Sequence, residues 1–209
     1  MHWDVLWQYR WELLSGLTLT CWLSAAAIVL STLVGVPVGA LWTTRHFYLS
    51  RAIGLVIEIM RNVPAVVKLF FLHFVIGMDA IPAGLLTLVI HQSAYIADVT
   101  VAGLRSIPSG QREGALACGH SDVQVFRYVL LPQAMRVMIP PLTTQYVQIV
   151  KNSAVVMLVA VEDLSFQTQF IEQQTFRGFE AATATTVMYI ILVLLISSAM
   201  SLLARRLSR

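Results

Sequence analysis

The chain has 209 residues, of which 57% are hydrophobic and only 12% are charged. Soluble domains usually carry about 25% charged residues, so a soluble protein of this length could not bury so much apolar surface. The net charge of +3 comes from arginines scattered over several loops and not from one basic face, which argues against a nucleic-acid partner. The composition predicts an all-α integral membrane protein, with residues 1–209 forming one transmembrane domain in membrane lipid.

Residues 1–15 are predicted to form an interfacial helix. Trp3, Trp7 and Trp11 are spaced by four residues, which places the three indoles on one helical face. Tryptophan is enriched where a membrane meets water, and such a helix lies in the plane of the interface. Anchoring in the outer leaflet is the simplest role for this segment, and binding of a partner is the alternative.

Five membrane spans follow the interfacial segment. Residues 13–44, 80–97 and 181–204 carry no charged side chain, and about 20 apolar residues are enough to cross the hydrocarbon core. The second span is interrupted by Glu58, Arg61, Pro64 and Lys68, and the fourth by Lys151. The predicted spans cover about residues 16–44, 52–76, 80–103, 137–160 and 181–204.

The basic residues orient these spans. Two of the loops and the C-terminal tail hold nine arginines, whereas the opposite side holds two basic residues and most of the acids. Because cytoplasmic loops are enriched in lysine and arginine, the N-terminus is predicted outside and the C-terminus in the cytoplasm. The nine are Arg45, Arg51, Arg105, Arg112, Arg127, Arg136, Arg205, Arg206 and Arg209.

The loop at residues 104–135, between the third and fourth spans, is predicted to hold two short helices. Gly119 is a natural stop for the first helix, and Ser121-Asp122 offers an N-cap for the second. Pro132 is expected to end the second helix, whose apolar face would carry Val125, Tyr128 and Val129. That face could pack back on the spans or dock on a soluble partner, and periodicity alone does not choose between them.

Particular residues of this loop favour docking on a partner. Glu113-Gly114-Ala115, followed by Gly119, Val129 and Leu131-Pro132, resembles the EAA loop of ATP-binding-cassette importer permeases. Every spacing of that pattern matches, and the departure is Gly114, where the family prefers alanine. The resemblance implies that this loop couples the spans to an ATPase subunit.

The resemblance extends over nearly the whole chain, to the polar amino-acid uptake branch of that family. It includes Gly16-Leu17-Thr18-Leu19-Thr20, Arg61-Asn62-Val63-Pro64, Ala94-Tyr95-Ile96-Ala97-Asp98, Ile107-Pro108-Ser109-Gly110-Gln111, Leu131-Pro132-Gln133-Ala134, Lys151-Asn152-Ser153-Ala154, Asp163-Leu164 and the segment 175–180. It implies a type I importer permease fold in a bacterial cytoplasmic membrane. The implied partners are two ATPase copies, an extracytoplasmic substrate-binding protein, a second permease (homodimer or heterodimer) and an amino-acid substrate.

The chain itself has no sequence feature of an enzyme. A P-loop needs Gly-x-x-x-x-Gly-Lys-Ser/Thr to bind phosphates, but Lys68 and Lys151 each follow a valine. ATP and Mg²⁺ are therefore expected on the partner ATPase, with no cofactor, metal site or catalytic residue in this chain. The rival interpretations are a stand-alone secondary transporter or channel and, with less support, a membrane enzyme.

Charged groups inside a bilayer are costly and mark transport pathways or structural ion pairs. The substrate-path candidates are Arg61, Asp98, Lys151, Asn152, Ser153 and Asp163. The spacing of Glu58 and Arg61 favours a structural ion pair between them. Lys151 could pair with Asp98, with Asp163 or with a substrate carboxylate. We expect it to bind the substrate, with Asn152, Ser153 and Asp163 adding polar contacts.

Overall fold

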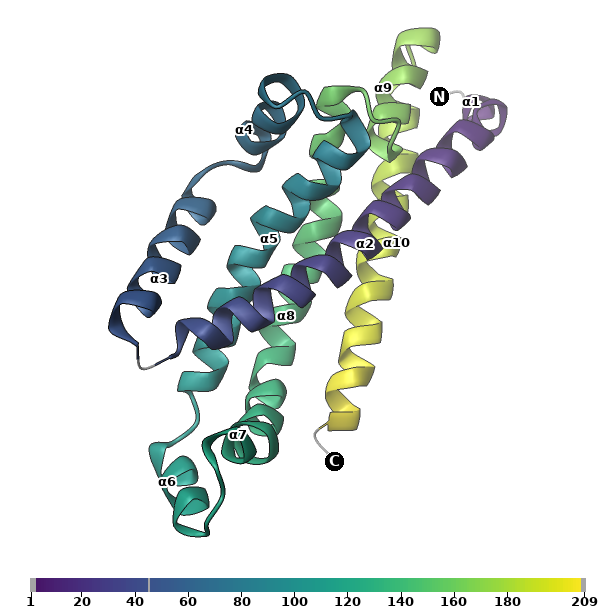
Figure 1. Cartoon of the computed structure of the whole chain (residues 1–209). Helices are drawn as coiled ribbons and strands as arrows, with labels where there is room; N and C mark the ends of the chain where they lie inside the picture. The colour runs from purple at the N-terminus through teal and green to yellow at the C-terminus, as the bar shows by residue number, and fades with distance from the viewer. Residues whose placement is uncertain (1–2, 45, 208–209) are drawn as a thin grey trace.

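The computed structural model describes residues 3–44 and 46–207, and it is helical in every regular element of that part of the chain. Long helical legs lie side by side to form the body of the molecule (Figure 1). The legs are α2 (Arg10–Trp42), a broken leg of α3 (Phe47–Asn62), α4 (Ala65–Phe70) and the π-helical η1 (Phe71–Val75), then α5 (Ala80–Arg105), α8 (Leu131–Ser153) and α10 (Gly178–Leu207).

The short elements lie at the two ends of this body. At one end, α6 (Ser109–Ala117) and α7 (Asp122–Gln124) project below the legs, and the π-helical η2 (Val125–Leu130) leads into α8. At the other end lie α1 (Asp4–Gln8), the 3-10 helix η3 (Ala154–Val159) and α9 (Leu164–Thr175). The projecting α6–α7 loop is therefore far from the N-terminus of the chain (Figure 1).

Three legs are long and apolar enough to cross a membrane by length and composition: α2, α5 and α10, measured over the described residues. The broken leg fails this criterion because Pro64 interrupts it, which leaves Ala65–Val75 as a shorter apolar helix. Val63, the residue before that proline, is extended with ψ of 123°, as the ring of a following proline requires. Helix α8 is also not among the helices that meet this criterion, so five membrane crossings stay a prediction.

A stripe of small side chains lets α2 lie against its neighbours. Gly16 approaches the start of α9, and Gly35 and Gly39 approach α5, where an added Cβ atom would be 2.8 Å from Ile96 and 2.5 Å from the carbonyl oxygen of Ala97. Such distances leave no room for a side chain. Small residues at a spacing of four are a common way for membrane helices to pack closely, and here they hold α2 diagonally across α5 (Figure 1).

The N-terminal segment differs from the single helix predicted for residues 1–15, of which residues 1–2 lie outside the described residues. The chain turns at Tyr9, which separates α1 from α2, so Trp11 already belongs to α2. The buried side chains of Val5 and Leu13 pack with Leu164, Ile171 and Ala181, and this packing sets the turn. Trp3, Trp7 and Trp11 are all exposed.

One predicted helix end is wrong. Pro132 does not end a helix: it occupies the first turn of α8, directly after the wider turns of η2. A proline is tolerated in the first turn of a helix, where its missing N–H costs no hydrogen bond. In the preceding π-segment each N–H bonds to the carbonyl five residues back, not four, so Pro132 breaks no regular α-helical bond there. The interruption predicted in the fourth span lies at the end of α8, which stops at Ser153, where the Ser153 hydroxyl donates to the Val150 carbonyl. The change to 3-10 geometry comes one residue later, at Ala154.

Candidate functional site

The α6–α7 loop is closed by a glycine turn. Gly119 has φ of 85°, a conformation that glycine adopts without a steric penalty. Its N–H donates to the Leu116 carbonyl at 2.9 Å, and the His120 N–H donates to the Ala115 carbonyl at 3.2 Å. This pair of bonds is a Schellman motif. Gly119 thus ends α6 and reverses the chain toward α7, as its place in the sequence predicts.

The second helix of the loop begins at a capping box. The Ser121 hydroxyl accepts from the Gln124 N–H, and the Gln124 side chain accepts from the Ser121 N–H. An ion pair between Arg112 and Asp122 then joins α6 to α7. Side-chain bonds therefore fix the angle between the two short helices, independently of any partner.

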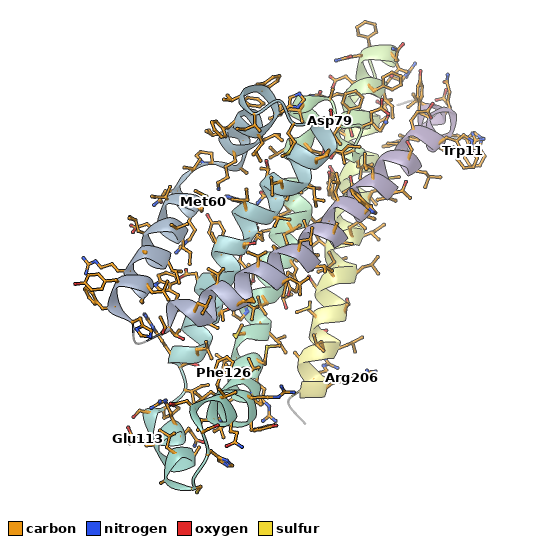
Figure 2. All side chains as sticks on the ribbon, in the orientation of Figure 1. Trp11, Met60, Asp79, Glu113, Phe126 and Arg206 are labelled. Atoms are coloured by element: carbon orange, nitrogen blue, oxygen red, sulfur yellow. The ribbon has the colours of Figure 1, made fainter. Side chains whose placement is uncertain are left out.

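The EAA-pattern residues lie mostly at the surface of this loop. Glu113 is exposed (Figure 2), as are Gly114, Gly119 and Pro132, whereas Ala115 and Leu131 are partly buried. No heavy atom lies within 4 Å of a Cβ built on Gly114, so an alanine would fit at this position without a clash. These residues are available to a partner.

The apolar face predicted for the second helix is wrong in part. Val125 is buried and Val129 is partly buried, whereas Tyr128 is 66% exposed. The wider π-turns of η2 rotate the side chains relative to a regular α-helix. The exposed apolar side chains of this region are instead Val123, Phe126 and Tyr128. Phe126 and Glu113 lie at the same end of the molecule as Arg206, opposite Trp11 and Asp79 (Figure 2).

A polar chamber of about 290 Å³ lies between α5 and α8. The Gln92 side chain donates to the Gln145 side chain at 2.6 Å across it. No charged side chain lines it among the residues that the structure describes, so it offers hydrogen-bonding groups without a formal charge. The lining residues are His91, Gln92, Tyr95, Thr144, Gln145, Gln148 and Asn152.

A second, smaller hollow adjoins this chamber through Tyr95, which lines both. Its volume is about 220 Å³, and its other lining residues are Glu58, Arg61 and Asn62. Arg61 bonds to Asp98 at 2.8 Å and its guanidinium lies 5.2 Å from the centre of the Tyr95 ring. The neutral chamber and the charged hollow therefore lie on either side of one shared residue, Tyr95 of α5.

The expected Glu58–Arg61 pair is therefore wrong: the carboxylate partner of Arg61 is Asp98, on α5. The break at Pro64 tilts α3 so that its C-terminal end meets α5. An ion pair within α3 would not link the two legs, whereas the observed pair does. It also removes Asp98 as a partner for Lys151.

The other predicted path residues are dispersed. Lys151 is exposed and lines a different hollow of about 470 Å³, against apolar residues of α10. Ser153 is buried and bonds within its own helix. Asp163 is buried and caps α9, accepting from the Phe166 N–H at 2.9 Å and from the Tyr189 hydroxyl at 3.3 Å. Of these four, Asn152 alone lines the chamber.

Sequence reasoning missed most of the chamber. Its glutamines carry no charge, so they do not stand out in a search for intramembrane ions. The available signal was the spacing of Gln92 with Tyr95 on α5 and of Gln145 with Gln148 and Asn152 on α8, which places polar side chains on one face of each span.

Fold and site define a class of protein: a helical membrane protein with a polar chamber between its legs and a projecting loop of two short helices. The family model described as "Binding-protein-dependent transport system inner membrane component" matches residues 31–209. The chain belongs to this family of inner-membrane transport components.

Known proteins resemble the chain over nearly its whole length. The glutamine transport system permease protein GlnP of Escherichia coli (strain K12) is 32% identical, covering 98% of this chain and 96% of that protein. The glutamate/aspartate import permease protein GltJ of the same strain is 31% identical, covering 92% and 85%. A solved amino acid ABC transporter with histidines superposes with a TM-score of 0.89 at 28% identity, covering 99% of both chains.

These comparisons make the chain a permease subunit of an ATP-binding-cassette importer with the type I permease fold. It is not an enzyme, because in such importers the ATPase is a separate subunit. Its partners include that ATPase and a substrate-binding protein. A stand-alone secondary transporter or channel is not favoured.

Proposed function

We propose that this permease imports a polar amino acid by alternating access, through the chamber between α5 and α8 and the charged hollow beside it. The observation that carries the proposal is the pairing of these two surfaces at Tyr95. A free amino acid is a zwitterion with a side chain, so it needs charged partners at one end and side-chain recognition at the other.

The charged hollow suits the zwitterionic end. Glu58 offers a carboxylate to the ammonium group, and Arg61 offers guanidinium N–H groups beyond those that hold Asp98. Both lie near the end of α3, at the break in its leg. Broken membrane helices are the usual place of transport sites, because their ends present unpaired backbone groups. The printed names of the relatives, which concern glutamine and glutamate/aspartate, support the same substrate class.

The assembly that we propose contains two permeases, identical or sister subunits, and two ATPase copies that bind ATP and Mg²⁺. The α6–α7 loop faces the cytoplasm and α9 faces outward, where the binding protein delivers the substrate. This orientation is supported by the seven described arginines at the end of the molecule that holds the loop, because cytoplasmic ends are enriched in basic residues. They are Arg51, Arg105, Arg112, Arg127, Arg136, Arg205 and Arg206. Arg45 and Arg209 lie outside the described residues.

Coupling follows from helix continuity. The helix that starts at Asp122 continues through η2 into α8, up to Ser153, so the second helix of the loop and the chamber wall belong to one continuous helix. When ATP closes the ATPase dimer, the loop moves with it and α8 tilts, which changes the side of the membrane to which the chamber opens.

Reconstitution tests this function. The chain is placed in liposomes with its ATPase and binding protein, and uptake of radiolabelled amino acids is measured with ATP or a non-hydrolysable analogue inside. We expect ATP-dependent uptake of one or a few polar amino acids, blocked by the analogue and by omission of the binding protein. Uptake by the chain alone at the same rate would refute the proposal and support a stand-alone transporter.

A further inference from the structure

Lys68 is a buried cation outside the hollow that holds Arg61. It lies on α4, just after the break at Pro64, and is only 8% exposed. Its ammonium donates to the carbonyl of Val63 at 3.0 Å and to the carbonyl of Met60, near the C-terminal end of α3 (Figure 2). The third contact of the ammonium is the Nδ1 atom of His91 on α5, at 2.9 Å.

These contacts determine which proton His91 carries. Two carbonyl oxygens at the C-terminal end of a helix favour a charged ammonium. An ammonium has three N–H donors and no acceptor, so two donors go to the carbonyls and the third goes to His91. Nδ1 must then accept, which leaves the imidazole neutral with its proton on Nε2.

His91 lines the chamber, and its ring packs on Tyr95 at 5.2 Å between centroids. Within residues 3–44 and 46–207, the one hydrogen bond of His91 is that of Nδ1 to Lys68, and Nε2 is not among the buried atoms that lack a partner. The Nε2–H group is therefore accessible and free to donate.

We propose that Lys68 holds His91 as the Nε2–H tautomer and that this N–H donates a hydrogen bond to an oxygen of the substrate, a carboxylate or a carboxamide. His91 is then a substrate-binding residue and Lys68 a positioning residue, which explains a lysine at the break of the second leg. The inference rests on the proposed function for its ligand, but the tautomer is independent of transport.

His73 provides an internal contrast. Its Nδ1 lies 2.8 Å from the Met78 carbonyl oxygen, which can only accept, so His73 carries its proton on Nδ1. The two histidines of neighbouring legs are thus expected in opposite tautomers within one molecule. Nitrogen NMR of the assembled complex in lipid, with ¹⁵N-labelled histidine, separates protonated from unprotonated ring nitrogens. The signals of each histidine are assigned by their loss in His91→Gln and in His73→Phe.

The NMR experiment should show His91 with an unprotonated Nδ1 and a protonated Nε2, and His73 with the reverse. In Lys68→Met, His91 should become a mixture of tautomers while the His73 signals stay unchanged. A proton on Nδ1 of His91 in the unmodified complex, or two protons on its ring, would overturn the inference even if transport is normal. Unchanged His91 signals in Lys68→Met would do the same.

Binding provides the second measurement. Radiolabelled amino acids are bound to the permease–ATPase complex without binding protein, and uptake is measured with saturating loaded binding protein. His91→Phe keeps the ring but loses the donor, so Kd should rise about tenfold, the equivalent of one hydrogen bond, and uptake should slow. His91→Gln, which places an amide N–H near the same point, should recover most of both.

The matched control is His73→Phe, for which Kd and uptake should be unchanged. If His91→Phe weakens the binding of every amino acid, the His91 N–H bonds to the α-carboxylate of the substrate. If it weakens only amino acids whose side chains carry an oxygen, the N–H bonds to that side-chain oxygen. Unaltered Kd and uptake in His91→Phe would overturn the substrate contact. Failure of the unmodified complex to transport any amino acid would instead refute the proposed function.

Discussion

Arg61 shows how single residues join the legs of this bundle. Its guanidinium bonds to Asp98 at 2.8 Å and lies over the Tyr95 ring, while the Tyr95 hydroxyl donates to the Arg61 carbonyl at 3.4 Å. Each contact runs from α3 to α5. Between them, the ion pair and the Lys68 contacts hold the broken leg against the chamber wall.

Removing one partner of this pair should be worse than removing both. Asp98→Asn removes the carboxylate that ties Arg61 of α3 to α5, so we expect a lower yield of folded complex and little uptake. Arg61→Gln/Asp98→Asn should recover the yield, because both charges are gone, but uptake should stay low since Arg61 also lines the charged hollow. Size-exclusion yield and ATP-driven uptake measure the two effects. Near-normal uptake by the double variant would place Arg61 outside the path.

Asp163 predicts a pH dependence of stability. Burial raises the pKa of this carboxyl from 3.8 to about 6, against the opposing effect of its hydrogen bonds. Because the folded-state pKa is raised, the ionised carboxylate costs stability above pH 6. The cost is lost as the pH falls through about 6, while the unfolded chain stays ionised down to about pH 4.

Thermal unfolding of the complex in detergent should therefore show a higher midpoint at pH 5.5 than at pH 7.5. Asp163→Asn should flatten this dependence, and the exposed Asp79→Asn should leave it unchanged. The full shift in pKa corresponds to about 3 kcal/mol, of which roughly 1 kcal/mol is gained between pH 7.5 and pH 5.5. Equal pH dependence in Asp163→Asn and the unmodified protein would contradict this origin.

At the scale of elements, the α6–α7 loop is a preformed unit. Its Schellman turn, capping box and inter-helix ion pair involve only its own residues, so its shape does not depend on the ATPase. If the ATPase docks here, as we propose, it meets a surface that is already ordered, which reduces the entropy lost on docking.

Gly119→Val should disrupt this unit without disturbing the legs. A β-branched residue is strained at φ of 85°, by about 1–2 kcal/mol, so α7 should be misplaced. We expect normal membrane insertion, loss of ATP-driven uptake and release of the ATPase on mild washing. Gly114→Ala is the matched control, because an added Cβ there meets open space and restores the residue that the family prefers. Full transport by Gly119→Val would show that the loop does not couple.

At the scale of the whole molecule, the charge asymmetry predicts topology. Thr44 and Asp79 lie at opposite ends of the broken leg, so an engineered cysteine at Thr44 should be labelled from the cytoplasm and one at Asp79 from outside. A membrane-impermeant maleimide on intact cells and on inverted vesicles measures this. Labelling of both cysteines from the same side would disprove the five-span arrangement.

Local chemistry made much of this architecture predictable. The long uncharged segments predicted the long helices. Gly119 and Ser121 predicted where the first short helix of the loop ends and the second begins, because a glycine turn and an N-cap depend only on neighbouring residues. The partner of Arg61 was not predictable, because it depends on how far Pro64 tilts α3 toward α5. The contact between Lys68 and His91 was not predictable for the same reason, since α3, α4 and α5 must meet before it can form.

The continuous helix from Asp122 to Ser153 also constrains how this protein can diverge. Each residue inserted into an α-helix turns everything beyond it by about 100° and shifts it by about 1.5 Å. One insertion between Pro132 and Gln145 would therefore rotate the α8 wall out of the chamber, even with the ATPase loop intact. Under the proposed function, substrate preference can change by replacement of Gln145, Gln148 or Asn152, but the number of residues between loop and chamber has to stay constant.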